Sequence, residues 1–184
     1  MPTMVSEILV RDALARDLES VTSVLRAANR EFEEVVPAAF YDAYQRNVLA
    51  VDSRLGDAQL LVAERSSQIV GTITLYPDAS REGWGWPAEW AGIRAVAVEP
   101  SARGLGVGRR LAESCIERAR QLDASAVCLH TAPFMSAAIA MYQAVGFRRA
   151  PEFDGDAAEL LGVAPLESYI PALAYRLDLT KEAT

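Results

Sequence analysis

Cysteine, histidine and long apolar runs are scarce in this sequence. Its 184 residues include two cysteines, Cys115 and Cys128, and one histidine. Two cysteines are too few for a disulfide framework, so a reducing cytoplasm is the expected compartment. No apolar run reaches the roughly 18 residues that a membrane span needs, and the first residues lack a signal-peptide pattern. We therefore expect a cytoplasmic protein that does not enter a membrane.

Positive charge is also in deficit, because the formal net charge is −7. That balance argues against a general nucleic-acid-binding protein, since phosphate contacts need a basic surface. Between Arg94 and Arg120, however, six arginines stand against three glutamates. A basic segment in an acidic chain favours one local anion site rather than a track for a long polyanion.

Hydrophobic spacing predicts alternating helices and strands. No internal repeat or low-complexity linker interrupts the pattern, so we expect one domain over residues 1–184, of the mixed α/β class. Helices are predicted over Ala13–Ala28, Pro37–Asn47, Leu105–Leu122 and Met135–Val145. Strands are predicted over Val5–Arg11, Gln59–Arg65, Gln68–Pro77, Ile93–Val98, Ala126–His130, Phe147–Phe153 and Leu173–Leu179.

Three glycines alternate in the segment RGLGVG, which joins a predicted strand to a predicted helix. A P-loop would need Lys followed by Ser or Thr, where this chain has Arg109 and Arg110. A Rossmann fingerprint would place its third glycine one residue later and an acid at the end of the next strand, where this chain has His130. Both nucleotide-binding interpretations fail.

Glycines without Cβ let backbone N–H groups approach a ligand, and a helix N-terminus adds partial positive charge. The segment is therefore a suitable cradle for a pyrophosphate. The alternative interpretation is a tight strand-to-helix turn in which the glycines serve only the backbone geometry.

The pattern V-x-V-x-P-x-x-R-G-x-G-x-G before a helix resembles the acyl-CoA-binding segment of the GNAT superfamily of N-acetyltransferases, with Arg103, Gly106 and Gly108 at its core positions. The segment AIAMYQAVGF, Ala138 to Phe147, is similar to a second segment of that family. The resemblance implies a GNAT-like fold, in which helices flank a mixed, mostly antiparallel sheet. It also implies transfer of an acetyl group from acetyl-CoA to an amine in a ternary complex, without a metal.

The resemblance implies roles for particular residues. Backbone groups of Val96, Ala97 and Val98 would pair with the pantetheine arm, and an N–H near Val96 or Ala97 would stabilise the oxyanion. Tyr142 would protonate the leaving thiolate, against the alternative of a packed helical tyrosine. The family often has an asparagine where this chain has Met135. The pyrophosphate would be held by the N–H groups of Arg103, Gly104, Leu105, Gly106, Val107, Gly108 and Arg109.

The acceptor side is less defined. Glu33 and Glu34 follow the first helix, on the side that faces the acceptor in the family, and they are candidates for acceptor binding or for the base that deprotonates the amine. Glu89 is another candidate for the base, and the alternative for all three is a solvated surface acid. His130 is either a proton relay or a plain core or strand-end histidine. Trp84, Trp86 and Trp90 either wall the acceptor site, fold onto the domain's own edge or serve a second subunit.

Two other functions stay open on the sequence. One is a transferase for a longer acyl-CoA, and the other is a non-catalytic module that binds acyl-CoA as a regulatory ligand. The first expectation is an enzyme whose partners are acetyl-CoA and an amine-bearing acceptor, either a small molecule or a peptide or protein amine. Because members of the family are often dimers, a homodimer is also open.

Overall fold

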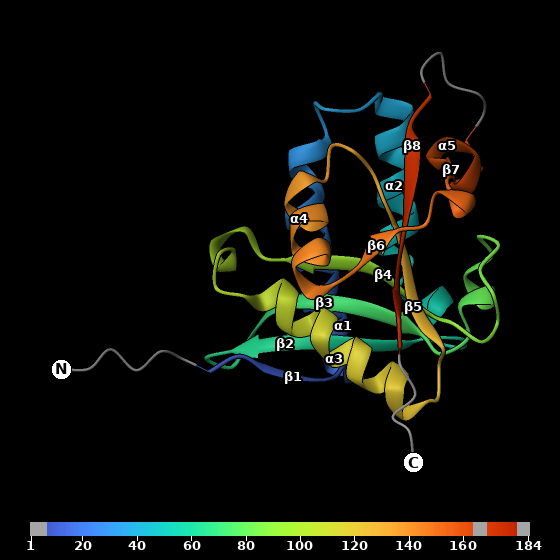
Figure 1. Ribbon diagram of the computed structural model, residues 1–184. Coiled ribbons are helices and arrows are strands. Elements are labelled where there is room, and N and C mark those ends of the chain that lie inside the picture. The colour runs from blue at the N-terminus through green and yellow to red at the C-terminus, as the bar shows by residue number, and fades with distance from the viewer. Residues whose placement is uncertain (1–6, 164–168, 180–184) are drawn as a thin grey trace.

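The computed structural model describes residues 7–163 and 169–179. In this part of the chain eight strands form one sheet, in the order β1-β2-β3-β4-β5-β8-β6 with β7 paired to β8 (Figure 1). The strands are β1 Leu9–Asp12, β2 Gln59–Arg65, β3 Gln68–Tyr76, β4 Ala91–Val98, β5 Ala126–Thr131, β6 Arg148–Arg149, β7 Gly155–Asp156 and β8 Pro171–Asp178. The α-helices are α1 Leu18–Asn29, α2 Ala38–Leu49, α3 Val107–Gln121, α4 Ser136–Val145 and α5 Ala157–Leu160.

Neighbouring strands of the sheet run antiparallel, except that β4 and β5 are parallel. The predicted hairpin is present, with β2 and β3 joined through Ser66 and Ser67. The prediction of a mixed, mostly antiparallel sheet flanked by helices is therefore confirmed.

Helices α1 and α3 cover opposite faces of the half-sheet β1–β4, and α3 crosses in front of β2 and β3 in Figure 1 while α1 lies behind. Successive strand residues point to opposite faces, so β2 supplies both cores. Leu61 and Ala63 pack in the cluster of α3, and Leu60 and Val62 pack in the cluster of α1. All four are buried, which explains why β2 reads as a nearly continuous apolar run.

The predicted bounds differ from the structure at several element ends. The first strand begins at Leu9, and residues 5 and 6 of the prediction lie outside the described residues. The strand expected over Phe147–Phe153 is only two residues long, because Pro151 has no N–H for the ladder and opens a 3₁₀ turn instead. The helix expected from Leu105 begins at Val107, so Gly108 is its second residue, and the helix expected from Ala13 begins at Leu18 after a 3₁₀ turn over Ala15–Asp17.

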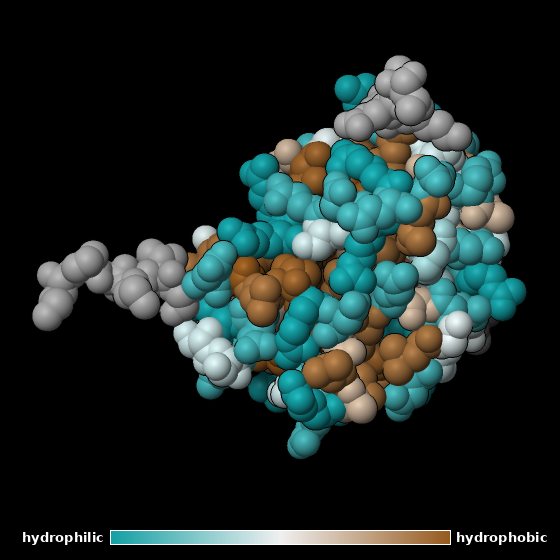
Figure 2. Space-filling model, turned by 90° about the horizontal axis from the view of Figure 1, so that it is seen from below, coloured by the Kyte–Doolittle hydropathy of each residue, from teal (hydrophilic) through white to brown (hydrophobic). Residues whose placement is uncertain are grey.

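Large apolar side chains on the surface come from separate segments, for example Leu9, Leu14, Leu105 and Leu122. The face seen in Figure 2 shows hydrophobic patches divided by hydrophilic side chains. The homodimer that the sequence left open stays a prediction.

We expect Gly71→Ala to destabilise the fold. A Cβ on Gly71 of β3 would lie 2.7 Å from Val107 Cγ1 and 3.2 Å from the Ala97 carbonyl oxygen, so α3 would have to move away from the sheet. Overpacking of this kind costs about 1–3 kcal/mol of unfolding free energy, measurable by urea denaturation. Gly56→Ala is the control, since its Cβ would meet nothing within 4 Å. Equal stability of the two variants would contradict the close packing described here.

Candidate functional site

Strands β4 and β5 diverge after a short paired stretch. They pair only at Ala91–Val127 and Gly92–Cys128. Beyond these positions β4 continues against β3, while β5 continues against β8. Within the part of the chain that the structure describes, the second edge of Ile93–Val98 therefore pairs with no strand. An unpaired edge offers N–H and C=O groups to an extended ligand.

A β-bulge in β4 accompanies the divergence. Thr72 pairs with Ala97 and Thr74 with Arg94, so one additional residue of β4 is accommodated opposite β3. Ala95 lies in the bulge and has a φ of 52°, in the left-handed region that a non-glycine residue seldom adopts. A bulge bends its strand and redirects nearby groups. The bend lies next to Val96 and Ala97, the residues expected to stabilise an oxyanion.

The glycine loop leaves a set of backbone donors without acceptors. The chain turns through Gly104 and Gly106, with φ of 76° and 80°, which glycine adopts without strain. No acidic residue lies in the first turn of α3, and no side chain caps it. Six N–H groups donate to no acceptor among the described residues, and they belong to Gly104, Leu105, Gly106, Val107, Gly108 and Arg109.

A cavity of about 440 Å³ lies where the unpaired edge of β4 meets the glycine loop. Its wall opposite β4 comes from α4 and the segment before it, through Met135, Ser136, Ala138 and Met141. Of the expected cofactor residues, Leu105 is the exception, because it is exposed and does not line the cavity. The nine that do are Val96, Ala97, Val98, Arg103, Gly104, Gly106, Val107, Gly108 and Arg109.

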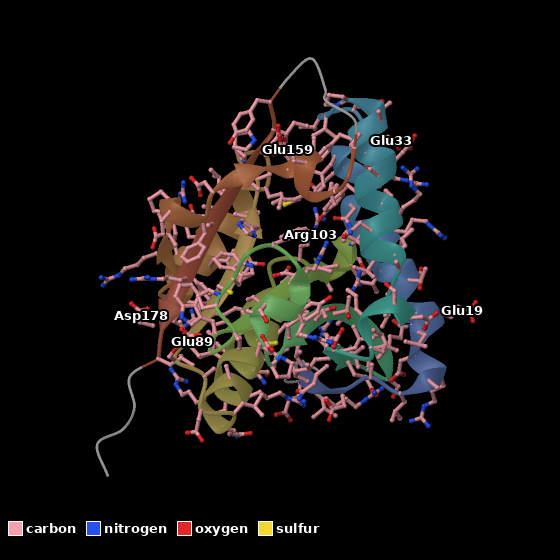
Figure 3. The ribbon with its side chains drawn as sticks, turned by 90° about the vertical axis from the view of Figure 1, so that its right-hand side faces the viewer. Glu19, Glu33, Glu89, Arg103, Glu159 and Asp178 are labelled. Atoms are coloured by element: carbon pink, nitrogen blue, oxygen red, sulfur yellow. The ribbon has the colours of Figure 1, made fainter. Side chains whose placement is uncertain are left out.

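Arg103 links the glycine loop to the end of α1. Its guanidinium donates to both carboxylate oxygens of Glu31, at 2.8 and 3.1 Å, and to the carbonyl of Ala28 at 3.1 Å. In Figure 3 Arg103 lies near the centre of the molecule, between Glu33 and Glu89. The side chain is partly exposed, so its contribution to stability is small and its effect is to set the position of the loop.

Tyr142 lies on α4 beside the cavity of about 440 Å³ but does not line it, whereas its neighbours Ala138 and Met141 do. The ring is buried and meets Phe147 edge-on, with 5.6 Å between the centroids. Its hydroxyl makes no hydrogen bond within the described residues. Burial raises the pKa of Tyr142 above its ordinary value. The phenol is therefore fully protonated at neutral pH and free to donate.

A second cavity, of about 80 Å³, adjoins the first. Tyr44 of α2 together with Phe134 and Met135 lines both cavities, so these three side chains form the junction between them. Burial raises the pKa of Tyr44 to about 12. Met135 is held at the junction by a contact of 3.6 Å between its sulfur and the Thr131 hydroxyl.

Arg94 is the charged side chain among the described residues that line the smaller cavity, and three contacts hold it. It donates to Asn47 Oδ1 on α2, and its guanidinium carbon lies 4.1 Å from the centroid of the Trp84 ring. An ion pair of 3.7 Å joins Nη1 to Glu82, which is buried and does not line the cavity. With 11% of its side chain exposed, Arg94 is a largely buried cation fixed in one orientation.

Glu82 is a buried carboxylate whose loss of hydration is not fully compensated by hydrogen bonds. Neither of its oxygens accepts a hydrogen bond from the described residues, and the Trp86 indole N–H nearby also lacks a partner. Burial raises the pKa of Glu82 to about 7, although Arg94 and the Trp86 N–H favour its charged form. Near neutral pH the carboxyl group is thus close to half protonated.

The tryptophans fold onto the domain's own sheet. Trp86 is buried and packs with Trp90, Phe153 and His130, at ring distances of 4.4 to 6.1 Å. It lines neither cavity, whereas Trp84 lines the smaller one. His130 also lines the smaller cavity, and burial lowers its pKa. Because a carbonyl only accepts, the 2.8 Å contact with Phe153 O places the proton on His130 Nε2.

The remaining candidates for the acceptor side, Glu33, Glu34 and Glu89, lie away from both cavities. Glu33 and Glu34 are exposed beyond the end of α1 and line neither cavity. In Figure 3 Glu33 and Glu89 lie at different ends of the molecule. Their carboxylates are solvated surface groups in this structure.

Sequence reasoning missed most of the smaller cavity. In the sequence Arg94 is the first arginine of a basic segment, and Phe40 and Tyr44 are aromatic residues of the helix predicted over Pro37–Asn47. Their i, i+4 spacing does place them on one side of α2, and this was the one available signal. Asn47 and Phe134 carry no local pattern that marks them.

None of the helices in residues 7–163 and 169–179 is long and apolar enough to cross a membrane. Over the same residues, no group of three or more His, Cys, Asp or Glu side chains is placed to hold a metal ion.

The family model for the acetyltransferase (GNAT) family matches residues 21–147. An IAA acetyltransferase of Azospirillum brasilense is 30% identical over 129 residues, which cover 70% of this chain and 77% of that protein. The N-alpha-acetyltransferase RimI of Mycobacterium tuberculosis is 35% identical over 79 residues, or 43% of this chain and 48% of the relative.

Solved structures share the fold at low identity. The PaiA N-acetyltransferase from Thermoplasma acidophilum, in complex with coenzyme A, superposes with a TM-score of 0.70 at 14% identity, covering 94% of this chain and 99% of that one. The acetyltransferase YncA of Salmonella typhimurium, with acetyl-CoA, gives a TM-score of 0.64 at 18% identity, over 96% of each chain.

We expect Glu82→Gln to remove a pH dependence of stability. The pKa is higher in the folded chain, about 7, than the ordinary 4.5, so the folded state binds the proton more tightly and wild-type stability falls as the pH rises between these values. From pH 4 to 8 the variant should gain about 3 kcal/mol relative to wild type, measured by denaturant unfolding. Glu89→Gln, at an exposed glutamate, is the control and should gain nothing. A constant difference between Glu82→Gln and wild type would contradict the raised pKa.

Proposed function

The chain belongs to the GNAT family of acetyltransferases, and from this premise we propose how its own residues carry out the reaction. The protein transfers an acetyl group from acetyl-CoA to an acceptor amine. The observation that carries the assignment of roles is the set of six N–H donors without acceptors beside the unpaired edge of β4.

These donors fit a pyrophosphate. Six N–H groups without acceptors follow one another through the glycine loop into the first turn of α3, where the helix adds partial positive charge and no acid of the first turn competes. The edge of Val96–Val98 would pair with the amide groups of the pantetheine arm, as an added strand does. When bound, acetyl-CoA supplies the thioester carbonyl carbon that the amine attacks.

Transfer is direct, without an acyl-enzyme. Both cysteines are buried, and burial raises the pKa of the Cys115 thiol to about 12 and that of Cys128 further. Neither thiol is a usable nucleophile, because the thiolate is the reactive form. The adjoining cavities support the alternative, in which donor and acceptor meet at the junction of Tyr44, Phe134 and Met135.

We assign stabilisation of the oxyanion to the backbone at the bulge in β4. A backbone N–H of Val96 or Ala97 has a fixed direction, so it stabilises charge on the carbonyl oxygen without reorganisation. The rigid bulge at Ala95 supports this role, since it fixes the backbone next to the junction of the two cavities.

We assign Tyr142 the role of the general acid that protonates the leaving thiolate. Its hydroxyl is protonated at neutral pH and has no competing hydrogen-bond partner among the described residues. A phenol with a raised pKa is a weak acid, so it acts only when the thiolate develops as a strong acceptor.

The acceptor must react as a free amine. The described residues that line the smaller cavity include Arg94 and no carboxylate. A nearby cation lowers the pKa of an ammonium group and favours its neutral form. The charge of Arg94 therefore favours an amine that has already lost its proton to water. His130 adds no second positive charge, because burial lowers its pKa and leaves it neutral at pH 7.

We further infer one acetyltransferase domain over residues 1–184 and a cytoplasmic location. The single sheet, which takes strands from both halves of the chain, supports the first inference, and the two buried free thiols support the second.

We expect Gly108→Glu to abolish tight binding of acetyl-CoA while the fold stays intact. Gly108 has ordinary helical backbone geometry, so a side chain there causes no strain, unlike one at Gly106. A carboxylate in the first turn stabilises the helix but repels the pyrophosphate. Calorimetry should show a loss of affinity of at least about 10-fold, equivalent to about 1.4 kcal/mol.

Gly108→Ala is the matched control, since its Cβ would make ordinary contacts of 3.5 and 3.8 Å with Val98 and Met141. It should bind acetyl-CoA with an affinity closer to that of wild type. Unchanged binding in Gly108→Glu would overturn the assignment of the cradle.

We expect Tyr142→Phe to lower kcat by about 100-fold with little change in acetyl-CoA affinity, as for the loss of a general acid. The substitution removes a hydroxyl that makes no hydrogen bond in the described residues, so unfolding free energy should barely change. Turnover is measured as release of free CoA. Normal turnover would refute the acid role, and a large loss of stability would show that the hydroxyl is structural.

A further inference from the structure

The smaller cavity has an unusual charge for a site that receives an amine. An amine in water is mostly a cation, and cationic substrates are normally attracted by carboxylates. Here the charged group on the wall is Arg94, and no carboxylate lines the cavity within the described residues. A simple alkylamine would meet net repulsion. An acceptor that also carries an anion would not.

Arg94 has N–H groups that are not used in hydrogen bonds to the described residues. Nη2 donates to Asn47 Oδ1, but Nη1 lies 3.7 Å from Glu82, beyond hydrogen-bond distance. Neither Nε nor Nη1 of Arg94 donates a hydrogen bond to a described residue, and neither is sealed in the interior as Nε of Arg54 is. Nε and Nη1 each share one edge of the guanidinium fork with Nη2, and Asn47 accepts from only one of the two Nη2 hydrogens. One edge therefore keeps both of its N–H groups, the arrangement that binds a carboxylate through two parallel hydrogen bonds.

The fork is also held in place before any ligand arrives. Trp84 packs against the guanidinium, Asn47 holds one end and Glu82 attracts it from below. Glu82 does not neutralise it fully, because burial keeps the pKa of that carboxyl near 7. Preorganisation of this kind reduces the entropy lost on binding.

Much of the rest of the wall is apolar, although Tyr44, His130 and Thr131 also line it. Phe40 and Val48 of α2 line the cavity together with Leu160 and Leu161 at the end of α5, and the enclosed volume is about 80 Å³. These four side chains fit a short hydrocarbon group.

We propose that the acceptor is a small apolar amino acid, whose carboxylate is bound by Arg94 while its side chain contacts Phe40, Val48 and the leucines of α5. The inference rests on the proposed acetyltransferase function, and it names the acceptor class. Arg94 is then the residue that determines specificity for an amine with a carboxylate.

The experiment compares free amino acids with their carboxamides. Alanine, valine, leucine and methionine, and the four corresponding amides, are offered with acetyl-CoA, and N-acetylated products are quantified. For the acids that react, wild type should show kcat/KM at least about 10-fold above that of the amides, as expected for loss of one charged hydrogen-bonded partner. This preference runs against intrinsic reactivity, because the amide raises the fraction of free amine.

Arg94→Gln should reduce the ratio of acid to amide at least about 10-fold, and Glu82→Gln, which leaves the fork intact and removes its buried competitor, should preserve or increase it. Comparing ratios between enzymes cancels differences in amine basicity. If Arg94→Gln lowers both rates equally, Arg94 acts only on the ammonium pKa and the proposal is wrong.

Inhibition provides a test that needs no variant, in case Arg94→Gln does not fold. 4-Methylpentanoate, the carboxylate of leucine without its amine, should inhibit wild type competitively against the acceptor, and 4-methylpentanamide should not. Equal inhibition by both compounds, or acetylation of amides and simple amines but of no amino acid, overturns the proposal while the transferase stands. Absence of acetyl-CoA binding would instead overturn the proposed function itself.

Discussion

The divergence of β4 from β5 is the constraint on which the site depends. Two paired positions hold the strands together at one end, and the bulge at Ala95 turns β4 away beyond them. The divergence exposes a backbone edge, opens the larger cavity and delivers the chain from Val98 into the glycine loop on the same side. A sheet that stayed closed would satisfy the same backbone groups internally and leave a turn with no ligand.

The larger cavity is formed mainly by backbone groups and the smaller one by side chains, and this difference decides how far each could be predicted from the sequence. The larger one uses backbone groups of a continuous segment, so glycine spacing and the flanking strand and helix predict it from the sequence. The smaller one uses side chains from α2, β4, β5, α5 and the loop that carries Trp84. Asn47 and Arg94 lie 47 residues apart and meet only through the fold. No local pattern predicts such a meeting.

The acidic residues illustrate the same limit. The sequence shows many carboxylates after residue 150, yet Asp154 pairs with Arg149 at 2.6 Å and Asp156 caps α5, so both serve the fold. Glu82 looks like an ordinary surface acid in the sequence, next to Arg81, which is exposed and pairs with Asp57. Its burial follows from the way the loop folds under Trp86, and its proton affinity follows from that burial. The order of helices and strands could be predicted from the hydrophobic pattern of the sequence, but these electrostatic properties could not.

The two cysteines have a practical consequence for enzymology. Both side chains are fully enclosed, Cys115 between α3 and the sheet and Cys128 beneath the tryptophan cluster. A colorimetric thiol reagent added to a reaction mixture therefore encounters liberated coenzyme and no protein sulfhydryl while the chain is native. The same reagent becomes a denaturation indicator once the interior opens, with two equivalents of signal per chain.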